Sequence, residues 1–241
     1  MPNKSTSSHA VPSVLGLKRS RLLEDVPVAG LEILARQCRW RRYLAAQRVI
    51  SRDAPDSDVY LIVSGRVRAT SFSVGGRQVT YRDIAAGDWF GDFAAIDGMP
   101  RSADVVALTD TLVAAMSPAV FRTLLHEHPA ACDRILHRLV TMVRELTDRI
   151  FELSTLGVRN RVHAELLRLA KMTGVRGNAA RIEPAPKHTE IASQVSTYRE
   201  QVTRELSAMV KQGLLQRDGR ALIIPDVARL EKIVAEVRRS P

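Results

Sequence analysis

The stretch that decides the fold runs from Thr189 to Leu206 and reads TEIASQVSTYREQVTREL. Apolar residues form one face before a tight connection at 195–197 and a second face after it: Ile191, Ala192 and Val195, then Val202, Leu206 and Val210. Thr197, followed three residues later by Glu200, fits a capping box, so we expect the second helix to begin there. The pattern predicts a helix-turn-helix, with helices over 188–195 and 197–212.

Polar side chains crowd the first turns of this second helix: Tyr198, Arg199, Glu200, Gln201, Thr203 and Arg204. The N-terminal residues of a recognition helix reach base edges in the major groove. Arginine pairs with guanine and glutamate accepts from cytosine. Arg199 and Arg204 are five residues apart, about 140° around a helix axis, so they would contact different bases. The pattern favours DNA reading; the alternative is a solvated charged face.

The helical pattern continues on both sides of this motif, over residues 157–241. Residues 161–172 predict an amphipathic helix, which the glycines at 174 and 177 interrupt. Residues 214–224 predict two short strands around Asp218-Gly219, a hairpin signal. Residues 226–238, just after Pro225, predict a final amphipathic helix.

Charge is concentrated in the same region. The chain carries a net +10, of which residues 158–241 hold +7. Lysines and arginines that meet phosphates release condensed counterions, so the asymmetry indicates a polyanionic partner for the last third of the chain. A basic domain that is merely well solvated is the alternative.

Residues 118–156 carry a different pattern. Apolar residues recur there at steps of three or four: Ile135, Leu139, Met142, Leu146, Ile150, Leu153 and Leu156. Charged residues are expected on the outward face: Arg144, Glu145, Asp148, Arg149 and Glu152. The spacing predicts a long helix that pairs with a second copy of itself. The alternative is that the stripe packs on the chain's own β domain.

Residues 40–116 alternate short apolar runs with turn signals. The runs lie at 59–63, 67–72, 78–84, 103–108 and 112–116, and Gly75-Gly76 suits a hairpin turn. No helix separates these runs, which argues against a parallel nucleotide-binding sheet. We expect an all-β barrel or sandwich.

Several classes are excluded or disfavoured by composition. No apolar run approaches the roughly 18 residues of a membrane span, and no secretory signal is visible, so a cytoplasmic location is expected. Cys38 and Cys132 are too few for a disulfide framework or an iron–sulfur cluster. No GxSxG elbow, P-loop or HExxH motif occurs, and no metal-ligand spacing, so we expect no enzyme and no metal site.

These features together resemble the bacterial transcription factors of the cyclic AMP receptor protein and fumarate–nitrate regulator (CRP/FNR) superfamily, over about residues 20–225. The resemblance implies an α+β fold. After a flexible tail at 1–20 it implies an N-terminal β-roll, the cyclic-nucleotide-binding jelly-roll, over 21–117. A dimerisation helix region over 118–156 and a C-terminal winged helix-turn-helix domain over 157–241 follow.

The recognition helix carries part of this resemblance. The family's Arg-Glu-x-x-x-Arg motif appears as REQVTR over 199–204, and residues 153–171 resemble the hinge and first helix of the DNA domain. Ser196 stands where the family often has glycine. In the cyclic-AMP-responsive branch the motif reads palindromic TGTGA-type half-sites, so the same preference is implied. The implied DNA-contacting residues are Thr189, Tyr198, Arg199, Glu200, Gln201 and Arg204.

Residues 90–103, FGDFAAIDGMPRSA, resemble the family's phosphate-binding cassette, FGELAL…PR(S/A/T)A. Gly91 lets backbone approach a ligand closely, and a short helix is expected from Asp92, with Phe93 in its first turn. Arg101 offers a planar fork to phosphate oxygens, and Ser102 adds a hydroxyl. Asp92 replaces the family's glutamate, which accepts from the ribose 2′-OH. An internal salt bridge is the alternative role of Arg101.

Alignment on the long helix places the family's two base-contacting hydroxyl positions at Leu146 and Thr147. Thr147 keeps the hydroxyl, which reaches the purine held by the other subunit, and Leu146 does not. The resemblance implies a cyclic nucleotide as effector, cyclic AMP as first choice and cyclic GMP as second, with no catalytic cofactor.

The sequence therefore predicts a homodimeric transcription regulator whose partners are double-stranded DNA, a cyclic nucleotide and RNA polymerase, with no membrane contact. Ligand at the cassette would bias how the long helices pair and thereby reposition both recognition helices. The alternatives are a ligand-independent regulator, or one of another ligand, of the same superfamily. A haem- or redox-sensing member and a nucleotide-binding subunit without DNA contact also stay open.

Overall fold

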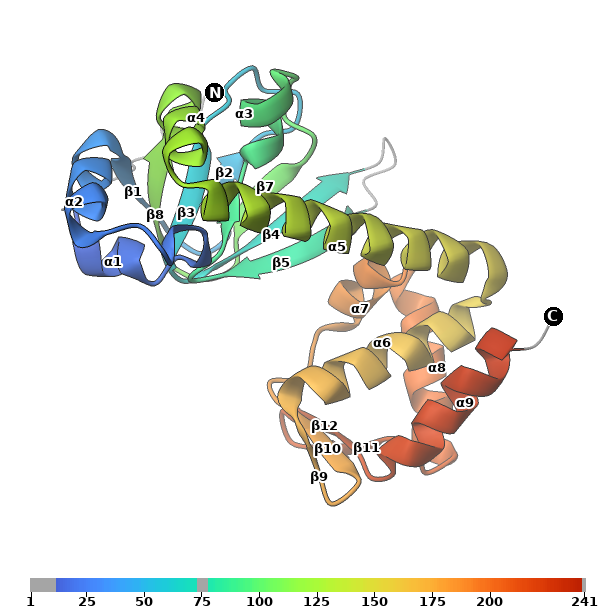
Figure 1. The fold of residues 1–241 in the computed structure, drawn as a ribbon. Coiled ribbons are helices and arrows are strands. Elements are labelled where there is room, and N and C mark those ends of the chain that lie inside the picture. The colour runs from blue at the N-terminus through green and yellow to red at the C-terminus, as the bar shows by residue number, and fades with distance from the viewer. Residues whose placement is uncertain (1–11, 73–77, 240–241) are drawn as a thin grey trace, which may run out of the picture. The chain divides into compact units, whose positions relative to one another are not determined.

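The computed structural model describes residues 12–72 and 78–239, and Figure 1 draws it as a ribbon. The chain divides into two compact units, residues 1–142 and 143–241. The division falls inside one continuous helix, α5 (Pro129–Thr155). Each unit has hydrophobic core clusters of its own.

Over the described residues, the first unit forms a β-roll of two four-stranded antiparallel sheets. The first sheet, in the order β1-β8-β3-β6, consists of β1 (Arg39–Tyr43), β8 (Thr111–Met116), β3 (Val59–Ser64) and β6 (Trp89–Phe90). The second, in the order β2-β7-β4-β5, consists of β2 (Arg48–Ile50), β7 (Asp104–Ala107), β4 (Arg66–Phe72) and β5 (Gln78–Ala85). The predicted strands are confirmed; the predicted Gly75-Gly76 turn lies outside the described residues.

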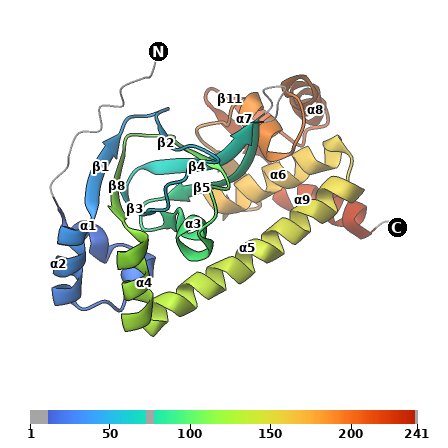
Figure 2. The ribbon, with the colours of Figure 1, turned by 90° about the horizontal axis from the view of Figure 1, so that it is seen from above.

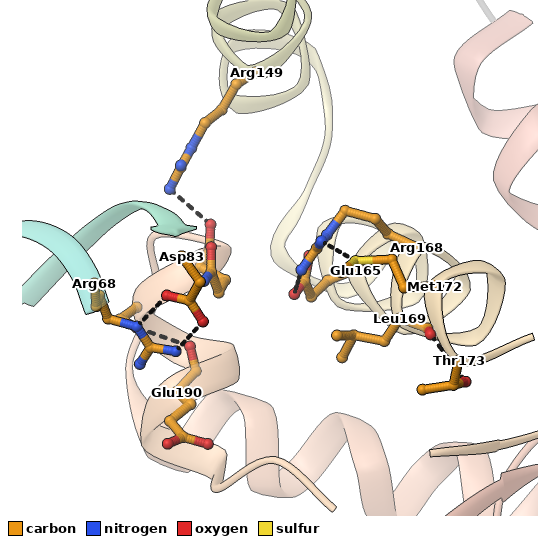
Figure 3. Close-up of polar contacts among 11 residues, drawn as sticks. Arg68, Asp83, Arg149, Glu165, Arg168, Leu169, Met172, Thr173 and Glu190 are labelled. Carbon is orange, nitrogen blue, oxygen red and sulfur yellow. Dashed lines mark hydrogen bonds and ion pairs between the residues drawn. The ribbon is translucent and has the colours of Figure 1, made fainter. Parts of the chain in front are cut away.

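The core of the roll follows from the alternation of side chains along each strand. All eight strands place at least one buried side chain in a single cluster, which includes Ile62 of β3, Val67 of β4 and Val105 of β7. On the solvated part of the second sheet, Arg68 of β4 lies opposite Asp83 of β5. Its Nε and Nη2 donate to the two carboxylate oxygens of Asp83 at 2.6 and 2.8 Å, which fixes the register of this pair (Figure 3).

Helices cover the other face of the first sheet. They are α1 (Val14–Lys18), the 3₁₀ turn η1 (Arg21–Leu23), α2 (Val28–Gln37), α4 (Pro118–Glu127) and the first turns of α5. Figures 1 and 2 show α1, α2 and α4 gathered at one end of the roll. The predicted tail over 1–20 is wrong in its last part. Ser13 Oγ caps α1 by accepting from Gly16 N at 3.1 Å, and Leu17 is fully buried.

Helix α5 confirms the predicted long helix but corrects the role of its apolar stripe. Ile135 is buried and Leu139 packs against the core of the first unit, so this part of the stripe packs on the chain's own β domain. A neighbouring row is exposed instead: Leu136, Val140, Val143, Thr147 and Ile150. Its spacing of four, three, four and three residues is that of a coiled-coil seam.

The second unit packs helices on a small sheet. Its helices are α6 (Val158–Thr173), α7 (His188–Gln194), α8 (Arg199–Lys211) and α9 (Val227–Arg239). The sheet, in the order β11-β12-β10-β9, consists of β11 (Gln216–Asp218), β12 (Ala221–Ile224), β10 (Ala179–Ile182) and β9 (Val175–Arg176). The helix-turn-helix and the hairpin around Asp218-Gly219 are confirmed.

One local prediction in this unit is confirmed and one is wrong. The predicted break at 174–177 is confirmed: α6 ends at Thr173 with Gly174 as its C-cap, and β9 and a hairpin turn follow, in which Gly177 and Asn178 both have positive φ as a primed turn requires. The predicted capping box of Thr197 with Glu200 is not formed. Tyr198 is the N-cap of α8 without a side-chain cap, and the Thr197 hydroxyl pairs with the amide oxygen of Gln201.

Candidate ligand-binding and DNA-binding sites

The cassette predicted from residues 90–103 is built around a tight backbone turn. Gly91 follows β6 with φ +86° and is the N-cap of the short helix α3 (Asp92–Asp97), which confirms the helix expected near Asp92. A Cβ at position 91 would lie 2.7 Å from the Asp58 carbonyl oxygen and 2.8 Å from Arg101 Nη1. Both the φ angle and the contacts therefore require glycine here.

Arg101 fills the space that Gly91 leaves open. Its side chain is only 3% exposed. Nη1 donates to the Gly91 carbonyl oxygen at 2.8 Å, and Nη2 donates to the Asp58 carbonyl oxygen at 2.8 Å. Nε and Nη2 also donate to Oδ2 of Asp56, at 3.2 and 2.6 Å. The guanidinium lies 5.7 Å from the Tyr60 ring centroid. The internal salt bridge weighed as an alternative is thus present.

Asp92 is also engaged inside the chain. The residue is 3% exposed, and its Oδ2 accepts from Trp89 Nε1 at 3.2 Å. Its Oδ1 lies 3.7 Å from Nη2 of Arg138, a residue of α5 whose guanidinium stacks 4.3 Å from the Trp89 ring centroid. Burial lowers the pKa of Arg138 to about 10. Its Nε and Nη1 are buried and have no hydrogen-bond partner among the described residues. The contact joins the cassette to α5.

The other predicted ligand residues lie on open surface. Phe93 is 39% exposed and Ser102 is exposed. On α5, Leu146 is 44% exposed, and the exposed Thr147 donates its hydroxyl to the Val143 carbonyl oxygen at 2.9 Å. Within one chain, therefore, the structure brings Gly91 and Arg101 into contact and leaves Leu146 and Thr147 exposed on α5, with Thr147 in the exposed row.

Three residues of the cassette region were not predicted from the sequence: Asp56, Trp89 and Arg138. A signal for Arg138 was available, because it lies three residues after Ile135 and so falls on the face of α5 that packs on the roll. Asp56 belongs to the loop between β2 and β3, far from the cassette in the sequence, and no local pattern points to it.

The predicted recognition helix presents its polar residues as expected. Val202, Leu206 and Met209 are buried and hold α8 in the core, while Arg199 and Arg204 are exposed. Tyr198 and Glu200 are exposed, Gln201 is half-buried, and Thr189 is exposed on α7. Within residues 12–72 and 78–239, no ion pair occupies the guanidinium group of Arg199 or of Arg204. The helix therefore presents two cations and a carboxylate on a rigid frame.

Charged side chains fix the helix-turn-helix against its neighbours. His163 of α6 is buried, and its Nε2 lies 2.7 Å from Oε1 of Glu205 on α8. Burial lowers the pKa of His163, although the bond to Glu205 acts in the opposite direction. Arg161 Nε donates to the Val195 carbonyl oxygen at 3.0 Å, and Arg149 Nη2 donates to that of Gln194 at 2.8 Å (Figure 3). Arg149, expected to face outward, instead binds the C-terminal end of α7.

Ser196, where glycine was expected, adopts φ +53°. This left-handed conformation is the one for which glycine is best suited, so the serine is accommodated at a modest cost in strain. The turn geometry of the motif is kept.

Other kinds of site are not seen in the part of the chain that the structure describes. No three His, Cys, Asp or Glu side chains there gather as metal ligands. Cys38 and Cys132 are both free thiols. None of the helices traced between residues 12 and 239 combines the length and the apolar character needed to cross a bilayer.

Comparison with protein families gives two matches. Residues 40–128 match the model of the cyclic nucleotide-binding domain, and residues 160–233 match the Crp-like helix-turn-helix domain. The first contains the cassette and nearly all of the β-roll, and the second runs from the first turn of α6 into α9.

Relatives and solved structures agree with these matches. The Cyclic AMP receptor protein of Thermus thermophilus is 30% identical over 175 residues, 73% of this chain and 78% of that protein. The CRP-like cAMP-activated global transcriptional regulator of Mycobacterium tuberculosis is 24% identical over 217 residues, 90% of this chain and 97% of that protein. A CooA variant from Carboxydothermus hydrogenoformans shares the fold with a TM-score of 0.76 at 23% identity, covering 94% of this chain and 98% of that chain.

Proposed function

Because the chain belongs to the CRP/FNR superfamily of transcription regulators, we propose that it is a homodimer whose affinity for DNA is set by a cyclic nucleotide. Cyclic AMP is the first choice, supported by the names of the two relatives, and cyclic GMP is the second. The superfamily consists of transcription regulators and not of enzymes, which confirms the prediction that this chain is not an enzyme. The observation that carries the proposal is that one helix, α5, connects a cassette containing Arg101 to a helix-turn-helix.

DNA is read by α8. Arg199, Glu200 and Arg204 are exposed on the helix whose opposite face is buried, so they can enter a major groove without loss of core packing. Their REQVTR pattern supports palindromic TGTGA-type half-sites. Two such helices in a dimer would meet successive major grooves about 34 Å apart.

The dimer forms through the exposed row of α5. Leu136 is 55% exposed, Val140 54%, Val143 62% and Ile150 64%, which is unusual for four apolar side chains in one heptad register. Thr147 lies in the same row, where it would approach the ligand held by the other subunit. Ligand and subunit contacts would thus share one helix, so that nucleotide binding biases helix pairing and the placement of α8.

The cyclic phosphate is proposed to bind beside Gly91, Arg101 and Ser102, with Phe93 at the rim. The carboxylate of Asp92, which accepts from Trp89, is proposed to position the cassette against α5 through Arg138. We also propose that the DNA-bound dimer acts on RNA polymerase in the cytoplasm.

A second candidate is a superfamily regulator that responds to another ligand or to none. The engagement of Arg101 by Asp56 and two carbonyl oxygens favours it. Arg101→Ala separates the two. If cyclic nucleotide control is correct, Arg101→Ala loses the response of DNA affinity to cyclic AMP and cyclic GMP. A variant that binds DNA and responds as the wild type does would refute the control by nucleotide.

A further inference from the structure

The partners of Arg101 differ in how readily they can leave. Two are backbone carbonyls, of Gly91 at 2.8 Å and of Asp58 at 2.8 Å, which the turn and the start of β3 hold in place. The third is the side chain of Asp56, whose Oδ2 accepts from both Nε and Nη2. Only this partner can depart without a change in the backbone.

Asp56 is placed so that it can leave. Its side chain is 47% exposed, whereas that of Arg101 is 3% exposed. Asp56 lies in the loop between β2 and β3, and its carboxylate makes no other hydrogen bond with the described residues. The neighbouring acid, Asp58, has its carboxylate paired with Arg39 and offers Arg101 only its carbonyl oxygen. A carboxylate that already contacts water loses little on returning to it.

Arg101 cannot be left without an anion. A guanidinium this deeply buried is strongly destabilised when its charged partner is removed without replacement. A phosphate ester presents the same kind of oxygen pair as a carboxylate to the planar fork. When a phosphate ester replaces the Asp56 carboxylate, the buried guanidinium of Arg101 therefore has an anionic partner both before and after the exchange.

We propose that Asp56 is an intramolecular competitor for the ligand: its carboxylate occupies the Arg101 fork and must swing out when a phosphate ester binds. The inference rests on the proposed function and deepens it, because it names the residue that sets ligand affinity at the cassette. Asp56 thus keeps the ligand-free protein folded around Arg101 and weakens nucleotide binding by the free energy of its own pairing.

The test compares the full-length wild type with Asp56→Asn, which keeps an oxygen acceptor but removes the charge. Asp53→Asn is the matched control, since Asp53 lies on the same loop and its carboxylate pairs with Arg52 and not with Arg101. Calorimetric titration with cyclic AMP and cyclic GMP should give a dissociation constant about five- to tenfold lower for Asp56→Asn than for the wild type, as expected for loss of a half-exposed pair. Asp53→Asn should bind as the wild type does. If Asp56→Asn does not fold, Asp56→Ser replaces it in the titration, and it too should have a lower dissociation constant than the wild type.

Inorganic phosphate provides a second probe, read as the shift in thermal unfolding midpoint. If the variant binds cyclic nucleotide no tighter than the wild type, or more weakly, the competition is refuted while the proposed function stands. If neither protein binds either nucleotide but phosphate stabilises Asp56→Asn more than the wild type, the competition holds and nucleotide control is refuted. If no probe distinguishes the proteins and no nucleotide binds, both are refuted.

Discussion

The exposed row on α5 makes a quantitative prediction about assembly. Val143 is in the middle of this row and is 62% exposed. Full burial of a valine, leucine or isoleucine side chain contributes about 1.5–3 kcal/mol, so the part of Val143 still open to solvent is worth about 1 kcal/mol in each subunit. Val143→Asp removes this burial free energy from both subunits of a symmetric dimer and places two carboxylates opposite each other. We expect a total loss of about 3–4 kcal/mol, which raises the dimer dissociation constant by roughly a few hundredfold.

Sedimentation equilibrium over a range of protein concentrations measures this constant directly. Thr141→Asp is the matched control: it introduces the same charge two residues earlier, at an exposed position outside the row, and should leave the constant unchanged. The reasoning fails if Val143→Asp remains as tightly dimeric as the wild type, or if Thr141→Asp dissociates to the same extent.

Three further predictions concern the cassette, the recognition helix and pH. Gly91→Ala should cost about 2–4 kcal/mol in denaturant unfolding because its Cβ would lie 2.7 Å from a carbonyl oxygen. Gly98→Ala, with φ +72° and no atom within 4 Å, should cost only about 1 kcal/mol; equal losses would contradict the close contact. Arg199→Lys should lose about 1–3 kcal/mol of discrimination at one base pair while binding to random duplex changes little, measured by anisotropy with duplexes altered one base at a time. Stability should fall as pH drops below about 6.5, because burial holds the pKa of His163 below its value of 6.5 in the unfolded chain, which then binds the proton first. His163→Asn should flatten the dependence of the unfolding midpoint on pH, and an unchanged slope would show that another group is responsible.

Much of the fold could be predicted because local pattern and tertiary structure agree. The two apolar faces on either side of Ser196 predict α7 and α8, and the short apolar runs over 59–63 and 67–72 predict β3 and β4. The short helix α1 could not be predicted, because five residues carry too little periodicity to reveal a face, and only contact with the roll stabilises it.

The stripe on α5 shows a different limit. Periodicity reports that a helix has an apolar side but not what covers that side. Ile135 and Leu139 belong to the core of the first unit, while Leu136 and Val140, one residue further on, form the exposed row. A helix with two adjacent apolar faces reads as one broad stripe in the sequence.

At the cassette, the sequence identifies residue types and the structure identifies their partners. Gly91 and Arg101 were each expected beside the ligand, and they are in contact. The sequence could not show that Asp56, 45 residues before Arg101, completes the fork. Nor could it show that Asp92 turns toward Trp89. The pairing of Asp56 with Arg101 depends on segments that the roll brings together, which is a long-range property, whereas Asp92 and Trp89 are only three residues apart.

The central claim is that a cyclic nucleotide controls how tightly this protein holds DNA. The most direct measurement is the affinity of the full-length protein for a labelled palindromic TGTGA-type duplex, by anisotropy at fixed salt, with and without cyclic AMP. We predict at least about tenfold tighter binding with the nucleotide, within the usual range of allosteric coupling, and loss of that gain on a scrambled duplex. Equal affinity for both duplexes, or an affinity that neither cyclic AMP nor cyclic GMP changes, would contradict the account.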